Sequence, residues 1–252
     1  MELLILTLAA FITSSISAVL GMGGGIILLG IMAIIIPEGY MVIALHGIIQ
    51  LISNTTRTYI FKQHLKWDII NKYIIGAIIG LFISAFIIIS LTNFSGVTSA
   101  NEIKFDILKP LIGIFIIWYL FFKKKRKEVK NNKSFVGVGL ISGIATVFVG
   151  ASGPLIAPFF LNRNLTKNNL IATKAACQTI THFGKIPLFI FLFNFKYADN
   201  LYVIIPLAIA VFIGTKIGKK ILGFIPEEIF IKLFKTTLFL IAVKLITTAY
   251  TF

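Results

Sequence analysis

Apolar runs long enough to cross a lipid bilayer recur along the whole chain. A helix rises about 1.5 Å per residue, so roughly 20 apolar residues span the hydrocarbon core. Runs near that length predict transmembrane helices at Met41–Phe61, Tyr73–Thr92, Ile107–Phe122, Asn168–Phe193, Leu201–Thr215 and Ile229–Tyr250. The pattern therefore predicts an all-α membrane protein.

Two further apolar stretches are interrupted by clusters of small residues. Leu3–Leu20 and Gly25–Ile36 flank the first cluster, and Phe135–Val149 and Pro154–Leu161 flank the second. In each case the second leg is too short to span alone. Backbone that leaves the helix inside a membrane must be buried in protein or line a water-filled cavity. Each stretch is therefore predicted to be a broken helical hairpin, although glycines also serve close helix packing.

The two broken segments belong to an internal duplication. A shift of 128 residues superimposes break and polar positions, pairing Gly25 with Gly153, Gln50 with Gln178, Asn54 with His182, and Arg57 with Lys185. Matches of this polar kind at one offset are not expected by chance in so apolar a chain. We predict transmembrane repeats at 1–122 and 134–252, joined by a basic linker at 123–133. Each repeat is a broken hairpin plus three transmembrane helices.

The basic residues orient these repeats. The run of Lys and Arg in 123–133 is the strongest cytoplasmic signal, because positive charges concentrate in cytoplasmic loops. With hairpins at both breaks, most other basic residues fall on the same side, and only Lys104, Lys109 and Lys196 fall outside. Repeat 1 then starts outside and repeat 2 inside, so the repeats are inverted. This architecture recurs in secondary transporters.

Composition narrows the function further. The chain of 252 residues is 58% apolar and only 13% charged, against about 25% charged for a soluble domain. The net charge is +15, and the Lys and Arg residues that produce it lie between apolar runs. This placement is typical of topology signals rather than of nucleic-acid binding. Cys177 is the single cysteine, which excludes an intrachain disulfide. No P-loop, metal cluster or paired nucleophile and base is found, so no cofactor, metal or catalytic residue is expected.

Cations, not carboxylates, occur within the predicted spans. All nine acidic residues lie in loops or at span ends, which disfavours a cation substrate. Two equivalent helical stripes carry polar and basic side chains at i, i+4, i+8 and i+11: His46, Gln50, Asn54 and Arg57, and Lys174, Gln178, His182 and Lys185. We interpret Arg57 and Lys185 as facing the protein interior. Lys174 and Lys244 lie nearer span ends and are interpreted as snorkelling.

The breaks supply a second feature that favours anions. A half-helix that starts at Gly25 or Pro154 presents free N–H groups and the positive end of its dipole. Glycines would let an oxyanion approach the backbone, and Ser152 would add a hydroxyl donor. The candidate substrate contacts are Gly23, Gly24, Gly25, Gln50, Asn54, Arg57, Ser152, Gly153, Gln178, His182 and Lys185.

The segment Gly-Met-Gly-Gly-Gly (21–25), its copy Gly-Ala-Ser-Gly-Pro (150–154) and the Gln-x-x-x-Asn stripe (50–54) resemble the sulfite exporter TauE/SafE family, within the toluenesulfonate uptake permease group. The resemblance implies a multi-pass protein of the bacterial inner membrane that transports sulfite, sulfonates or thiosulfate. The second copy departs from the Gly-rich pattern at Val149, Ala151 and Pro154. Expected partners are a small anionic substrate and the lipid bilayer, with no nucleic acid, and a homodimer is left open.

Two classes of function remain after these observations. The leading hypothesis is a secondary transporter that works by alternating access. The alternative is an anion channel, which would share the basic stripes but need a continuous water path.

The predicted topology can be tested by cysteine labelling in intact cells. With 123–133 in the cytoplasm and both termini outside, a cysteine at Glu128 should react with an impermeant maleimide only after the membrane is opened. Labelling of that position in sealed cells would contradict the orientation of both repeats.

Overall fold

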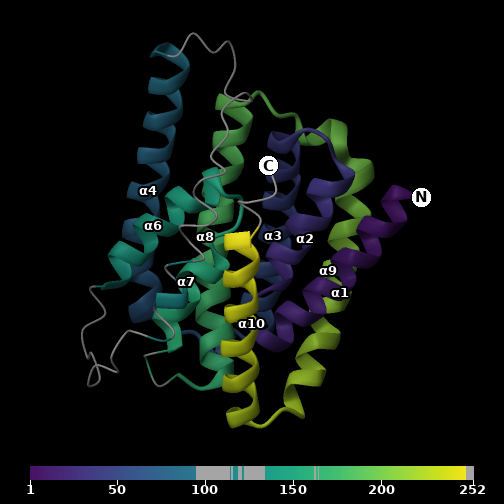
Figure 1. Ribbon diagram of the computed structural model, residues 1–252, viewed down its shortest axis with the longest axis vertical. Helices are drawn as coiled ribbons and strands as arrows, with labels where there is room; N and C mark the ends of the chain where they lie inside the picture. Colours follow the sequence, from purple (N-terminus) through teal and green to yellow (C-terminus); the bar gives the residue numbers. More distant parts are fainter. Residues whose placement is uncertain are drawn as a thin grey trace.

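The computed structural model describes 1–94, 114, 116–118, 121, 134–161, 163 and 165–247. Most of the expected span Ile107–Phe122 and the whole linker 123–133 lie outside the described residues. Within the described part, the regular secondary structure is entirely helical (Figure 1). The expected class, an all-α protein, is confirmed.

The helices of each half follow the same order along the chain. In the first half they are α1 (Glu2–Leu20), α2 (Gly24–Ile35), α3 (Gly39–Ile60), the short η1 (Lys62–His64) and α4 (Trp67–Phe94). In the second half they are α6 (Ser134–Phe148), α7 (Gly153–Leu161), α8 (Lys167–Leu192), η3 (Tyr197–Asn200), α9 (Leu201–Gly223) and α10 (Glu227–Thr247). These bounds lie close to the predicted apolar runs, except that α4 begins at Trp67 rather than Tyr73 and α9 ends at Gly223 rather than Thr215.

Both expected breaks are present, and glycine makes each of them possible. Gly21 and Gly23 have φ of 71° and 92°, and Gly150 has φ of 82°, in the left-handed region that side chains disfavour. After the first break α2 folds back along α1, with Gly24 packed on the carbonyl of Thr13. After the second break the chain also reverses, so that Arg163 donates a 2.8 Å hydrogen bond to Ser134, where α6 begins.

The first helix of each half packs along a helix of the other half. The largest helix–helix interfaces are those of α4 with α6 and α1 with α9. In both pairs the two helices run in the same direction. Gly76 and Gly80 of α4 pack on Val136 and Leu140 of α6, and Gly214 and Gly218 of α9 pack on Phe11 and Ser15 of α1. The hydroxyl of Ser15 also donates to the carbonyl of Gly214 (3.0 Å). Small residues allow this approach of backbone to backbone.

Helices α3 and α8 form the centre of the bundle and run in opposite directions. Lys185, late in α8, contacts Gly47 near the start of α3. Toward the other end, the hydroxyls of Thr58 and Thr179 lie 3.5 Å apart. The polar stripes predicted from the sequence lie on these two helices, and most of their side chains are buried.

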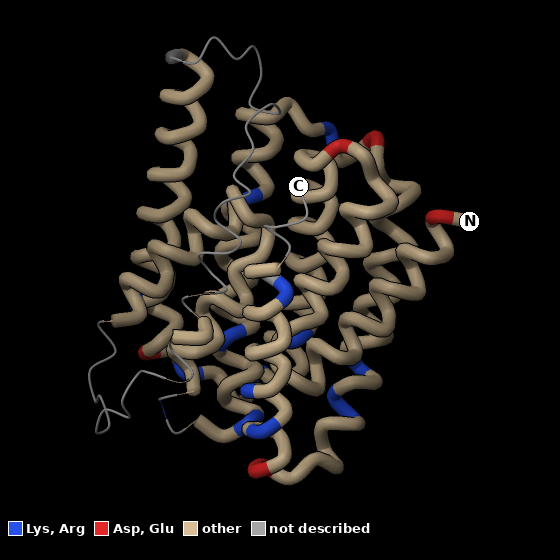
Figure 2. The backbone as a smooth tube through the Cα atoms, in the orientation of Figure 1, with Lys and Arg blue, Asp and Glu red and all other residues tan. Residues whose placement is uncertain are grey.

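Most of the described Lys and Arg positions lie toward one end of the bundle (Figure 2). Lys62 lies in η1, Lys167 begins α8 and Lys219 lies near the end of α9. Contacts between segments at this end include a bond from Asn169 to the carbonyl of His64 (2.8 Å) and one from Lys219 to the carbonyl of Ile60 (3.2 Å). Chain segments that are far apart in the sequence therefore bring their positive charges to one face.

By length and apolar composition, four of the described helices can cross a membrane: Glu2–Leu20, Trp67–Asn93, Lys167–Leu192 and Tyr197–Gly223. We also expected spans at α3 and α10, and neither reaches this level of apolarity. Helix α3 carries the buried polar stripe, which lowers its mean hydropathy. Helix α10 contains Glu227, Glu228, Lys232, Lys235 and Lys244.

Close packing between α4 and α6 predicts a sharp difference between two neighbouring glycines. A Cβ at Gly139 would lie 2.1 Å from the carbonyl oxygen of Tyr73, whereas a Cβ at Gly137 meets nothing within 4 Å. Gly139→Ala should destabilise the protein by about 1–3 kcal/mol, the usual cost of overpacking. Gly137→Ala should stabilise it slightly, because alanine favours the helix by ~1 kcal/mol. Thermal unfolding of purified protein measures both, and equal unfolding temperatures would contradict the packing.

Candidate functional site

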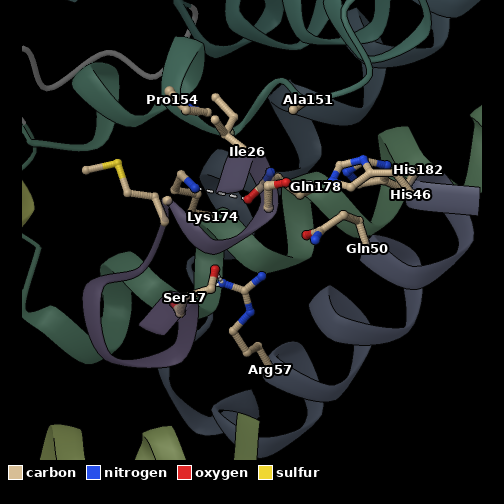
Figure 3. Close-up of a pocket in the computed structure, with 14 residues that line it drawn as sticks. Ser17, Ile26, His46, Gln50, Arg57, Ala151, Pro154, Lys174, Gln178 and His182 are labelled. Atoms are coloured by element: carbon tan, nitrogen blue, oxygen red, sulfur yellow. Dashed lines mark hydrogen bonds between the residues drawn. The ribbon is translucent and has the colours of Figure 1, made fainter. Parts of the chain in front are cut away.

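A small cavity lies where the two helix breaks meet α3 and α8 (Figure 3). The space open to the centre of a water molecule is about 20 Å³. That is little more than one water sphere. The lining comprises Ser17, Met22, Gly23, Gly25 and Ile26 around the first break, Ala151, Gly153 and Pro154 at the second, His46, Gln50 and Arg57 from α3, and Lys174, Gln178 and His182 from α8.

Each half-helix start is paired with a glutamine at the cavity. A Cβ built on Gly25 would lie 3.1 Å from Oε1 of Gln50, and one built on Gly153 would lie 3.0 Å from Nε2 of Gln178. The two pairs are related by the same offset of 128 residues. Gly25 is in the first turn of α2 and Gly153 begins α7, so backbone N–H groups with no partner inside their own helix lie near each amide. The same local arrangement thus occurs twice at the cavity.

Arg57 reaches the cavity from the end of α3. Its side chain is 2% exposed, and the guanidinium donates to the hydroxyl of Ser17 (2.8 Å), the carbonyl of Ser17 (3.1 Å) and Oδ1 of Asn54 (2.6 Å). The Nε of Arg57 and the Nδ2 of Asn54 are buried without a hydrogen-bond partner. Unpaired buried donors are rare and costly. They mark a place where an acceptor would fit.

Lys174 also points into the cavity, and the snorkelling interpretation of this residue is wrong. The side chain is 1% exposed, and Nζ donates to the carbonyl of Gly21 and to Oε1 of Gln178, both at 3.0 Å. The reason is local geometry: Lys174 lies two turns inside α8, beside the first break, where the carbonyl of Gly21 accepts a hydrogen bond from its ammonium. Lys244, in contrast, is exposed near the end of α10.

Two histidines lie next to each other in the wall of the cavity. The rings of His46 and His182 lie 6.2 Å apart in an edge-to-face arrangement. The Nε2 of His46 is 2.8 Å from the carbonyl of Gly25, and its Nδ1 is 3.2 Å from the carbonyl of Gly150. The Nδ1 of His182 is buried without a partner. Within the described residues, no group of three His, Cys, Asp or Glu side chains could hold a metal ion.

The electrostatic character of the site follows from what lines it. Arginine keeps its charge in proteins, and Lys174 supplies a second charge when protonated. No acidic side chain is among the lining residues. Removing an unpaired charge from water costs several kcal/mol. An anion in the cavity would therefore compensate Arg57 and Lys174 and accept hydrogen bonds from donors that now lack acceptors.

Four of the predicted contact residues do not line the cavity. Gly24 packs on α1, where a Cβ would lie 1.8 Å from the carbonyl oxygen of Thr13. Asn54 accepts a hydrogen bond from Arg57 and is not among the lining residues. Ser152 accepts a hydrogen bond from Thr146 (2.8 Å). Lys185 donates to the carbonyl of Ile43 (2.8 Å) and lies over the ring of Phe189.

The remaining seven predicted residues do line it: Gly23, Gly25, Gln50, Arg57, Gly153, Gln178 and His182. The prediction omitted Ser17, Met22, Ile26, His46, Ala151, Pro154 and Lys174. The sequence could have indicated two of these, because His46 and Lys174 are the first residues of the two polar stripes and are related by the same offset of 128. Ser17 carried no such signal, because its role depends on how α1 packs against α3.

Together the fold and the cavity define an α-helical membrane protein with a buried cationic site between two helix breaks. The family model of the sulfite exporter TauE/SafE matches residues 6–245, so the chain belongs to this family. Membership implies a membrane transporter of sulfur-containing anions, in agreement with the expectation that the chain is not an enzyme. Searches of curated proteins and of solved structures give no match.

Neighbouring glycines at the first break should respond differently to the same substitution. Gly24→Ala should lower the unfolding temperature, because the added methyl collides with backbone of α1. Gly25→Ala meets only the flexible amide of Gln50, so the protein should stay folded while sulfite binding weakens. Thermal unfolding and sulfite binding of the two variants test this. Unchanged sulfite binding in a folded Gly25→Ala variant would argue against a substrate site at the break.

Proposed function

We propose that the protein is a secondary transporter of a compact sulfur-containing oxyanion and that the cavity is its substrate site. The observation that carries this proposal is the presence of Arg57 and Lys174, both buried, beside two half-helix N-termini with no carboxylate among the lining residues. Helix N-termini attract anions through free N–H groups and the helix dipole. Charge-assisted hydrogen bonds from arginine to an oxyanion are about twice as strong as neutral ones.

The size of the cavity supports a compact anion. Space for the centre of a water molecule is only about 20 Å³, so a bulky organic sulfonate would require larger rearrangement than sulfite or thiosulfate. Sulfite and thiosulfate are therefore our first choices within the sulfur anions.

For the mechanism we propose alternating access between two inverted repeats, 1–122 and 134–252. Three features support inversion: α3 and α8 run in opposite directions, each half begins with a helix packed on the other half, and the breaks fall at equivalent positions. The substrate site lies between the repeats, as in other transporters with broken helices. Rocking one repeat against the other would open the cavity to either side.

The proposed location is the bacterial inner membrane, with the basic end of the bundle in the cytoplasm. Support comes from the charges at that end, because cytoplasmic loops carry an excess of lysine and arginine. A carrier is preferred to a channel, and counterflow in proteoliposomes distinguishes them. Unlabelled sulfite inside the vesicles should accelerate uptake of labelled sulfite by a carrier, which a channel does not reproduce without a membrane potential.

Removing one cavity cation should weaken anion binding by roughly 10- to 100-fold. This follows because charge-assisted hydrogen bonds contribute ~1.5–3 kcal/mol and ~1.4 kcal/mol is tenfold in affinity. The variants are Arg57→Gln and Lys174→Met, with Lys244→Met as a control at an exposed position outside the cavity. Sulfite affinity is measured by calorimetry on purified protein, with thermal unfolding alongside.

A further variant separates the cavity from the rest of the polar stripe. Because the ammonium of Lys185 donates to the carbonyl of Ile43 and does not line the cavity, Lys185→Met should change stability more than affinity. Normal sulfite affinity in both Arg57→Gln and Lys174→Met would rule out the proposed site. A larger loss of affinity in Lys185→Met than in those two would move the site to the other end of the stripe.

A further inference from the structure

His46 connects the two helix breaks through both of its ring nitrogens. Its Nε2 lies 2.8 Å from the carbonyl oxygen of Gly25 in the first half of the chain. Its Nδ1 lies 3.2 Å from the carbonyl oxygen of Gly150, at the second break. The side chain is fully buried and lines the cavity (Figure 3). A single side chain of α3 thus contacts backbone that belongs to both hairpins.

The chemistry of imidazole makes this arrangement depend on a proton. A neutral ring has one N–H donor and one acceptor, whereas both carbonyl oxygens can only accept. A neutral His46 therefore satisfies one carbonyl and turns a lone pair toward the other. Only the doubly protonated ring donates to both. Because the contact with Gly150 is the longer one, it is the contact that a neutral ring would give up first.

The equivalent residue of the second half makes the reciprocal connection. Lys174 is related to His46 by the offset of 128, and its ammonium donates to the carbonyl of Gly21 at the first break. Thus each half reaches across to the break of the other half from the same position. One of these positions is a lysine with several donors. The other is the residue type whose charge changes near neutral pH.

Among the described residues, the ionisable groups that line the cavity with His46 are all basic. From α8, the groups close to it are His182, whose ring lies 6.2 Å away, and Lys185, and Lys174 lines the same cavity. From its own helix there is Arg57. Helix α2 contributes no ionisable side chain, and the second break contributes none between Gly150 and Pro154. An anion in the cavity would offset these positive charges, and a proton on His46 would then be less unfavourable.

We propose that His46 is a proton-binding site linked to the anion site, so that substrate and one proton bind together. This inference rests on the proposed function and adds the second ion that the transporter binds. With the anion and the proton bound, His46 donates to Gly25 and Gly150 and holds the two hairpins together. Loss of the proton frees the carbonyl of Gly150, which loosens one repeat from the other. Linkage is reciprocal, so the proton must strengthen anion binding as much as the anion strengthens proton binding.

The test is the number of protons taken up when an anion binds. Thiosulfate is the probe, because it carries no proton of its own near neutral pH. Calorimetry at pH 7 in two buffers of different ionisation enthalpy gives that number directly. The wild-type protein should take up close to one proton per thiosulfate, and its affinity should tighten by up to about tenfold for each unit of falling pH.

Variants assign the proton to a residue. His46→Gln, whose amide can still donate to Gly25, should bind thiosulfate with no proton uptake and with an affinity that does not change with pH. If that variant does not fold, His46→Asn keeps a donor near the Nδ1 position and serves the same purpose. His64→Gln is the matched control, since His64 lies in η1 outside the cavity, and it should behave as wild type.

The outcomes separate this inference from the function on which it rests. Thiosulfate binding without proton uptake in the wild type, or uptake that persists in His46→Gln, would overturn the proton site and leave the anion site standing. Loss of uptake in His182→Gln but not in His46→Gln would also overturn it, by assigning the proton to the other ring. Absence of binding heat with both thiosulfate and sulfite would overturn the anion site and the linked proton together.

Discussion

Interrupting a helix inside a membrane releases backbone carbonyl and N–H groups that lipid cannot satisfy. Much of the centre of this protein is organised around that constraint. Side chains lie within hydrogen-bond distance of carbonyls around the two breaks: Arg57 donates to Ser17 and Lys174 donates to Gly21. The two ring nitrogens of His46 lie 2.8 Å from the carbonyl of Gly25 and 3.2 Å from that of Gly150. Buried cations and a histidine are therefore present at the breaks for a structural reason before any substrate binds. These side chains satisfy backbone groups at the breaks, and the same side chains make the cavity that they line positive.

The duplication that the sequence predicts would explain why this solution appears twice, and divergence of the two copies would explain why it is not symmetric. Gln50 beside Gly25 and Gln178 beside Gly153 repeat one contact in both halves. At the ends of the stripes the copies differ, because Arg57 lies beside the cavity whereas Lys185 turns to the carbonyl of Ile43. A guanidinium has five donors and can bond Ser17 and Asn54 while keeping Nε free. A lysine ammonium at the other position is engaged by a single carbonyl and the ring of Phe189.

Much of the fold could be predicted from the sequence, since the apolar runs, the two breaks and the polar stripes depend only on local composition and helical spacing. The side of the helix on which Gln50 and Arg57 lie follows from the same spacing. The direction of a long side chain does not. Lys174 and Lys185 each have four rotatable bonds, and the acceptor that each finds is set by packing between distant helices. Likewise, Gly24 and Gly25 are adjacent glycines in one motif. Gly24 is a packing residue because it contacts α1, and the sequence does not show this contact.

In the substrate site proposed above, the same contacts would also determine how tightly an anion is held. Arg57 and Lys174 already donate to Ser17, Asn54, Gly21 and Gln178, so an entering anion must share or displace these acceptors rather than meet bare charges. The gain on binding is then the difference between two sets of hydrogen bonds, which is smaller than either set alone. Conduction through a membrane site requires binding that is favourable enough for entry and weak enough for release. Carbonyls at the breaks would compete with the anion for the same donors, and this competition would meet both requirements. The carbonyls stabilise the empty site, and they would accept hydrogen bonds from these donors again as the anion leaves.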